Sequence, residues 1–246
     1  MHNKGLLFAA VGAVVGFSAQ AHALEVISPY VVKGELELEH QGLISHDRDP
    51  EASNAQAYVG SIGYTPTNWW RAEFESEFER EAGPDHKTRY SSFNMENTFQ
   101  LTEPGDYWMD WGAFVEFDIG RNREPNQAVF GLLGEKSFGK IEETVNLLLH
   151  KDFGGSAEVT PTGLSYSSQT KYRLTQYFEP GFEIYGDTDG KEKFAQEQFS
   201  AGPGLFGKIP TANGQALKYQ LAYLRGATPS TPDSTVRWKL EYEFYF

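Results

Sequence analysis

Apolar and charged residues alternate with a period of two along most of this chain, from about residue 30 to its last residue. The clearest case is the stretch WWRAEFESEFER, residues 69–80, in which Phe74 and Phe78 stand between glutamates. A helix of this sequence would spread its glutamates around most of its circumference, whereas a strand places them all on one face. The alternation therefore predicts β-strands, each with one apolar face that must be covered.

The same sorting predicts twelve strands in a single domain, residues 24–246. Their connections alternate between short turn-like segments, such as 65–68 and 103–105, and mostly longer polar segments, such as 42–54 and 152–161. This pattern favours an all-β fold, an antiparallel up-and-down β-barrel. Pro203 and its neighbouring glycines predict a bulge or bend, and the ambiguous stretch 181–209 leaves ten or fourteen strands as alternatives. The predicted strands are residues 30–41, 57–64, 69–80, 91–101, 107–119, 128–136, 141–151, 164–174, 181–187, 198–209, 217–225 and 236–246.

Residues 1–23 have the features of a cleaved secretory signal peptide. Lys4 precedes the apolar run 5–17, and Ala21-His22-Ala23 offers an A-x-A cleavage site. The run is shorter than the ~20 residues that a membrane-spanning helix needs. The whole chain has a formal charge of −13, and cleavage would remove one lysine and no acid, so we expect no nucleic acid partner. The chain has no cysteine, which excludes disulfides, thiol nucleophiles and cysteine metal sites.

Two features indicate that the apolar faces meet lipid. These faces are nearly free of charge along whole strands, with Glu143 as the main exception, whereas the opposite faces are rich in charge. Aromatic residues, 15% of the chain, also occur near both ends of the apolar faces, as they do at the two lipid–water interfaces of membrane barrels. A soluble sandwich or lipocalin-like barrel, the alternative, would turn its apolar faces inward. The sequence therefore predicts a transmembrane β-barrel.

The chain ends on an alternating apolar series, Trp238, Leu240, Tyr242, Phe244 and Phe246. In a closed barrel the last strand pairs with the first, so an apolar face that extends to the terminus is held in place. This ending, joined to a signal peptide, resembles the assembly signal of Gram-negative outer-membrane proteins. The resemblance implies residence in outer-membrane lipid and recognition of the C-terminal strand by the barrel-assembly machinery.

A looser resemblance rests on residues 223–244, YLRGATPSTPDSTVRWKLEYEF. This stretch is similar to the outer-membrane barrels named after the meta-cleavage pathway of phenol degradation. The resemblance implies an aromatic or pathway-related solute, and it transfers no functional residue.

With the apolar faces outward, acids outnumber bases on the predicted inner face. Twelve strands about 4.8 Å apart and tilted by about 40° leave a central gap of about 10 Å. We therefore expect a passive channel for a small polar or aromatic solute, without cofactor or metal, that favours cations. The Glu73–Glu79 ladder is expected to face Lys171, Arg173 and Lys218 across the lumen. The predicted selectivity residues are Glu35, Glu37, Glu73, Glu75, Glu77, Glu79, Glu96, Asp110, Glu116, Lys171, Arg173, Lys218, Arg237 and Lys239.

Two alternatives stay open beside the channel. The first is a narrow structural barrel whose lumen is closed by salt bridges. The second is an outer-membrane lipid hydrolase, which needs a serine beside a histidine that a third polar group orients. His150 and Ser167, on neighbouring predicted strands, are the candidate pair, but no family motif surrounds them, so we expect no enzymatic activity. Asp187-Thr188-Asp189-Gly190 resembles part of a calcium loop without its bidentate acid, and an ordinary loop turn is the better interpretation.

Overall fold

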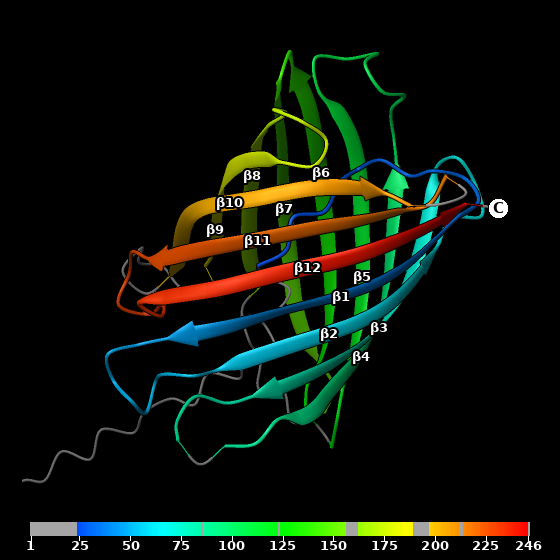
Figure 1. Ribbon diagram of the computed structural model, residues 1–246. Coiled ribbons are helices and arrows are strands. Elements are labelled where there is room, and N and C mark those ends of the chain that lie inside the picture. Colours follow the sequence, from blue (N-terminus) through cyan, green and yellow to red (C-terminus); the bar gives the residue numbers. More distant parts are fainter. Residues whose placement is uncertain are drawn as a thin grey trace, which may run out of the picture.

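The computed structural model describes residues 24–84, 86–122, 124–155, 162–188, 197–211 and 214–245. The predicted signal peptide, residues 1–23, and the terminal Phe246 lie outside these ranges. The described residues form twelve strands (Figure 1). They are β1 (Glu35–His46), β2 (Gln56–Tyr64), β3 (Trp70–Arg80), β4 (Arg89–Gln100), β5 (Asp110–Gly120), β6 (Asn126–Phe138), β7 (Ile141–Phe153), β8 (Gly163–Tyr172), β9 (Glu179–Asp187), β10 (Gln198–Pro210), β11 (Ala216–Gly226) and β12 (Ser234–Tyr245).

Each strand pairs antiparallel with its neighbour in sequence, and β12 returns to β1 to close the barrel. The closing pairs run from Glu35 opposite Tyr245 to His46 opposite Ser234, so the last strand has no free edge. The predicted twelve-stranded up-and-down barrel is therefore confirmed. No described helix is long and apolar enough to cross a membrane.

The bulge that the sequence predicts at Pro203 is not observed. Pro203 stays paired with Phe182 of β9, and the register between β10 and β11 is the same on both sides of it. The register shift lies elsewhere, between β3 and β4 at Ser76 and Phe78. Proline is tolerated in β10 because the strand can lose one ladder hydrogen bond there without a change of register.

The two faces of the barrel are oriented as the alternation predicts. On β3, Phe74 is 44% exposed on the outside, whereas its neighbour Glu75 is 2% exposed inside the barrel. Leu147 of β7 and Leu240 of β12 are likewise exposed, whereas Glu116 of β5 and Glu243 of β12 are buried. The wide outward apolar surface requires lipid rather than water around it. The alternative of a sandwich or barrel with an apolar interior is excluded by this orientation.

Exposed aromatic rings gather where the strands enter the short turns. Trp69 stacks on Phe99, and Trp108 meets Trp111 edge to face. These rings lie at one level of the barrel, because β3 begins and β4 ends there and β5 begins there. Amphipathic rings at such a level are typical of a lipid–water interface.

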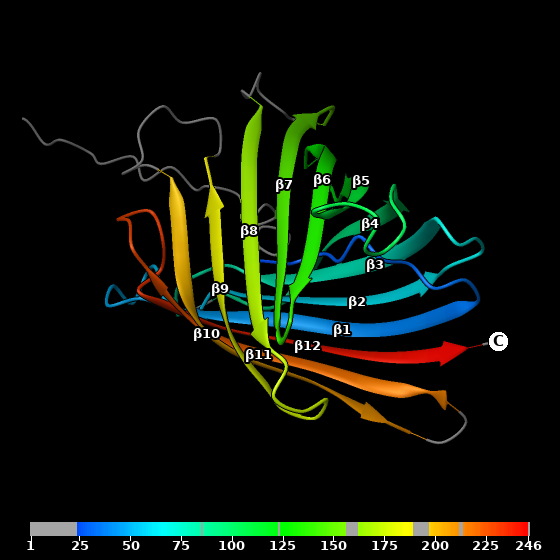
Figure 2. The same ribbon diagram turned by 90° about the horizontal axis from the view of Figure 1, so that it is seen from above.

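The chain before β1 runs inside the barrel. The predicted first strand, residues 30–41, is shorter at its start, since β1 begins at Glu35. A turn over residues 32–35 joins the inner chain to β1: the N–H of Glu35 donates to the carbonyl of Val32, and Gly34 has φ of 82°, which favours glycine. Residues 24–32, drawn in blue in Figures 1 and 2, lie within the ring of strands. We call residues 24–32 the inner segment.

Candidate functional site: a lumen filled by the inner segment

The inner segment descends through the barrel from the long-loop end to the short-turn end. Leu24 packs against Leu43 and Tyr185, which lie near the long-loop ends of β1 and β9. Tyr30 reaches Asp110, the first residue of β5, at the short-turn end. The segment therefore occupies most of the height of the lumen, and any solute has to pass beside it or displace it.

Asn146 of β7 binds the backbone of the segment at mid-height. Its Oδ1 accepts from the N–H of Ile27 at 2.8 Å, and its Nδ2 donates to the carbonyl of the same residue at 2.8 Å. The hydroxyl of Ser167 on β8 donates to the carbonyl of Glu25 at 2.9 Å. A buried coil needs partners for its peptide groups, and the wall of the barrel provides them here.

A buried ion pair holds the side chain of the segment's one acid. The Nζ of Lys239 on β12 lies 2.8 Å from Oε1 of Glu25 and 2.5 Å from Oε2 of Glu39 on β1. The amide of Gln41 donates to the other oxygen of Glu25 at 3.3 Å. Each of these side chains is more than nine-tenths buried. Removing one partner of such a group leaves an uncompensated charge inside the barrel.

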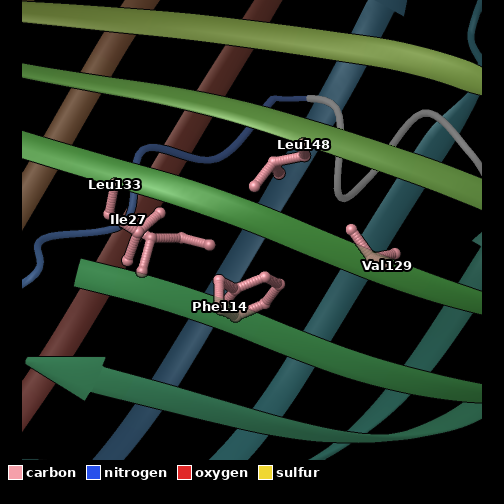
Figure 3. Packing of buried hydrophobic residues seen from close by; sticks show 5 residues of the cluster. All are labelled: Ile27, Phe114, Val129, Leu133 and Leu148. Carbon is pink, nitrogen blue, oxygen red and sulfur yellow. The ribbon is translucent and has the colours of Figure 1, made fainter. Parts of the chain in front are cut away.

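Apolar side chains of the segment fill two pockets on opposite walls. Figure 3 shows Ile27 among residues of three neighbouring strands, Phe114 of β5, Val129 and Leu133 of β6 and Leu148 of β7. Val26, the adjacent residue, packs against Tyr185, Ala222 and Leu224 of β9 and β11. Successive side chains of an extended chain point to opposite sides, so two consecutive residues reach both pockets.

The lower part of the segment is held by hydroxyl groups and by a backbone contact. Ser28 donates to Glu135 at 2.8 Å, and the Val31 N–H donates to Gln100 at 3.0 Å. The Tyr30 hydroxyl donates to Asp110 at 2.6 Å. Burial raises the pKa of Tyr30, and its hydrogen bond to Asp110 raises it further, so the phenol stays protonated and keeps its donor role.

The predicted acidic ladder of β3 lies inside the barrel and contacts its own side of the wall. Arg71 bonds Glu37 of β1 at 2.6 Å and lies 3.4 Å from Glu73. Ser92 of β4 donates to Glu77 at 3.2 Å, and the amide of Asn94 lies 3.5 Å from Glu75. Glu96 and Glu116 are also buried, on the inner faces of β4 and β5. The inner placement that the alternation predicts for these acids is therefore observed.

The three bases expected to face the β3 ladder make their ion pairs within their own part of the wall. Lys171 and Arg173 contact Glu142 of the neighbouring β7, and Arg173 lies in the turn after β8 rather than on a strand. Lys218 of β11 contacts Glu241 and Glu243 of the neighbouring β12. The register explains this, because Lys171 stands opposite Glu142 and Lys218 opposite Glu241. These bases balance acids of their own wall.

Arg237 makes a pair that does reach beyond the adjacent strand. Two nitrogens of its guanidinium group contact Glu183: Nε donates to Oε2 at 2.7 Å, and Nη2 contacts Oε1. Arg237 lies on β12 and Glu183 on β9, with β10 and β11 between them. The bidentate pair is fully enclosed and ties two parts of the wall together.

A cavity of about 510 Å³ lies beside the inner segment in the short-turn half of the lumen, and Ile27, Ser28 and Tyr30 are among its lining residues. Charged groups of both signs line it, among them Glu35, Glu37, Lys171, Lys208 and Lys218. Around Leu24, at the long-loop end, the residual space is only about 30 Å³. The lumen therefore has a polar vestibule at one end and a filled section above it.

Two clusters of three carboxylates in the lumen are close enough together to suggest metal binding. The first is Glu39, Glu73 and Glu75, and the second is Glu35, Glu37 and Glu243; within each group one oxygen per residue lies within 4.8 Å of the others. Both groups already contain cationic partners. Lys239 contacts Glu39 and Arg71 contacts Glu37 and Glu73, whereas Lys208 and Lys218 contact Glu243. Their chemistry is that of an ion-pair network, and the residues do not make a metal cage.

The candidate hydrolase pair does not come together among the described contacts. His150 lies 3.3 Å from Asp187, and Ser165 donates to the other oxygen of that aspartate at 2.8 Å. Ser167 instead donates to the segment and to Asn146. In a nucleophilic triad the histidine stands between the serine and the acid. Here Asp187 stands between His150 and Ser165, so this arrangement is not that of a triad. Asp187 ends β9, and Asp189 and Gly190 lie outside the described residues.

Comparison with known proteins finds similarity to solved structures. No protein-family model matches the chain, and no curated protein matches it in sequence. Three solved channel structures share its architecture. The COG4313 outer membrane channel from Pseudomonas putida F1 has a TM-score of 0.59 and 15% identity, over 88% of this chain and 97% of that one. The fold is that of an outer-membrane channel barrel.

Two further channels of this fold cover similar shares. The NanC porin has a TM-score of 0.54 and 10% identity, over 85% of this chain and 100% of that one. The KdgM porin, solved in complex with disordered oligogalacturonate, has a TM-score of 0.52 and 8% identity, over 86% of this chain and 99% of that one. At these identities the likeness concerns the fold.

Proposed function

We propose that this protein is an outer-membrane channel for a small solute, closed in this structure by its inner segment. The observation that carries the proposal is the polar lumen. Many ionisable side chains, Glu75, Glu77 and Lys239 among them, point into a barrel whose outside is apolar. Charges at membrane depth are costly unless they line a water-filled path or pair with one another, and they commonly mark a solute pathway. The 510 Å³ vestibule provides space for such a solute.

The charge of the lumen bears on the class of solute. Acids predominate on the inner faces of β1 to β5, although Arg71 of β3 contacts Glu37 and Arg89 of β4 stands opposite Glu79. Rings of carboxylates favour cations in channels. The oligogalacturonate bound to the KdgM porin is a polyanion, so that class of solute does not suit this lumen. A small polar solute without several negative charges suits it better; an aromatic solute, which the resemblance to the phenol-pathway barrels implies, is the second candidate.

A permanently closed structural barrel is the competing proposal, and one observation favours it. The segment is fastened by wall residues of β7, β8 and β12, and ion pairs of the wall add to the obstruction. The two proposals differ in whether the segment ever leaves. Three further statements belong to the channel proposal. The chain is cleaved after Ala23, and the barrel has no catalytic activity. The assembly machinery recognises the C-terminal series Trp238, Leu240, Tyr242, Phe244 and Phe246.

Conductance in planar lipid bilayers tests the channel. The full mature chain is compared with an Asn146→Ala, Lys239→Gln double variant, whose segment has lost its main polar anchors. The channel predicts discrete current steps that are rare in the parent and frequent in the double variant, with cations favoured. Both proteins must first show the heat-dependent gel mobility of a folded barrel. A silent bilayer with both folded proteins, and no swelling of liposomes in sugars or amino acids, contradicts the channel and leaves the structural barrel.

A further inference from the structure

The inner segment lies in the lumen as a peptide ligand lies in a binding site. Its backbone is extended, its peptide groups bond to wall side chains, and its side chains enter separate pockets. Contacts of this kind recognise an extended peptide in general, since a peptide backbone is the same whether it belongs to this chain or to another.

We propose that the wall around Glu25–Ser28 is a binding site for short extended peptides that carry an acid followed by two aliphatic residues, and that the inner segment occupies this site when the channel is closed. The inference names a solute class for the channel and rests on the proposed function. It identifies three recognition elements, which are the backbone anchors, the cation and the two apolar pockets.

The backbone anchors recognise any peptide. Asn146 pairs with both polar groups of one residue, which fixes the direction and the register of the chain. The hydroxyl of Ser167 donates to the carbonyl of Glu25, two residues earlier. Both side chains are buried, and Asn146 is 1% exposed. A simple aromatic acid lacks the paired N–H and carbonyl that match the two groups of Asn146.

The cation and the pockets select the sequence. Lys239 contacts the carboxylate of Glu25, so an acid at this position is favoured. Val26 and Ile27 pack against clusters of apolar side chains, and Phe114, Val129, Leu133 and Leu148 would face polar solvent if Ile27 left. An apolar patch on the inner face of a polar lumen needs an apolar occupant, which the peptide supplies.

Competition with the tethered segment sets the concentration scale. A segment joined to the wall has an effective concentration in the millimolar range, so a free peptide of the same sequence displaces it only at comparable concentrations. When a free peptide displaces the inner segment, the residues of the segment become exposed. The wall residues stay covered, because the free peptide takes the place of the segment. This difference separates specific exchange from general opening of the barrel.

The experiment uses the full mature chain, which has no native cysteine. Two single-cysteine variants report the exposure of the segment and of the wall. Val26→Cys lies on the inner segment, and Ala222→Cys lies in the wall pocket that Val26 fills. The peptide Leu-Glu-Val-Ile-Ser is added at millimolar concentration, and the rate of maleimide labelling is measured in detergent. We expect labelling of Val26→Cys to rise about tenfold and labelling of Ala222→Cys to stay low.

Two controls make the result specific. A peptide with glutamine in place of the glutamate should be about tenfold less effective, because it loses a charge-assisted contact with Lys239. Asn146→Ala, combined with Val26→Cys, should label fast without any peptide, whereas Ser165→Ala, whose hydroxyl bonds to Asp187 rather than to the segment, should not change the rate.

The inference is overturned if folded Val26→Cys labels at the same rate with both peptides and without peptide, or if Ala222→Cys is exposed in parallel. The labelling rates do not depend on conductance. Current steps without peptide-dependent labelling would therefore reject the peptide site and leave the channel, whereas peptide-dependent labelling in a barrel that never conducts would reject the channel.

Discussion

Asn146 binds both backbone polar groups of Ile27, a residue 119 positions away in the sequence, from the wall of the barrel. This contact joins the first described residues to the middle of β7, and it gives the lumen a fixed occupant. Its geometry leads to the first of four predictions.

Asn146→Ala should loosen the inner segment. The N–H and carbonyl of Ile27 lose their partner, and leaving buried polar groups unsatisfied costs about 1–3 kcal/mol. We expect the barrel to stay folded and its single-channel current to appear more often in planar bilayers. Ser165→Ala is the matched control, because Ser165 lies on the inner face of β8 and bonds to Asp187 rather than to the segment. Equal current frequencies in the two variants would contradict the gating role.

Lys239→Gln should destabilise the fold more than Asn146→Ala does. The substitution leaves Glu25 and Glu39 without the cation that lies between them, and breaking a buried pair costs about 3–5 kcal/mol. Urea unfolding in lipid vesicles measures the loss. Adding Glu25→Gln should recover part of it, because one of the two uncompensated carboxylates is removed. A double variant as unstable as the sum of the two single variants would show that the residues do not interact.

Reversing the charge of Glu75 and Glu77 should change ion selectivity. The pair Glu75→Lys, Glu77→Lys replaces two buried acids on the inner face of β3 with bases, so the reversal potential in a salt gradient should shift toward anions. Glu143→Gln is the control: Glu143 lies on the outer face, where Ser168 donates to it at 2.5 Å, so its removal should leave selectivity unchanged. A reversal potential that is the same in all three proteins would remove these glutamates from the permeation path.

Leu147→Arg should be costly because Leu147 lies on the outer face at the middle of β7. An arginine at the bilayer midplane destabilises a membrane barrel by about 2–4 kcal/mol, and one near the interface by about 0–1 kcal/mol. Phe153→Arg, on the same face at the long-loop end of the same strand, is the control at the depth of the interface. Refolding titrations into vesicles should therefore separate the two variants. If they have the same stability, the position of the membrane belt is wrong.

The sequence predicts the faces of the barrel well because the side-chain period of a strand is fixed by the backbone. Phe74 and Glu75 take opposite sides wherever β3 begins. The partners of the charged groups depend on register, which the alternation does not encode. Lys218 stands opposite Glu241 in the register of β11 and β12 and pairs with it, a partner that the alternation alone does not identify.

The inner segment could not be predicted from a periodic pattern, because its backbone partners come from distant strands. Two local signals pointed toward it. Pro29 interrupts any strand that would begin before Tyr30, and Phe114 is a large apolar residue on a face that is otherwise polar. Neither signal shows that the two features belong together, since Ile27 and Phe114 meet only after the barrel has closed.

The turn at Val32–Glu35 has a consequence for how the pore recloses. It fastens the occupant of the lumen to the rim of β1 at the short-turn end, so a released segment remains attached to its own barrel. Reclosure is then a first-order process whose rate is independent of how many copies the membrane holds. Scission at the exposed Lys33 would abolish this tether, and reclosure would then depend on the concentration of the freed segment.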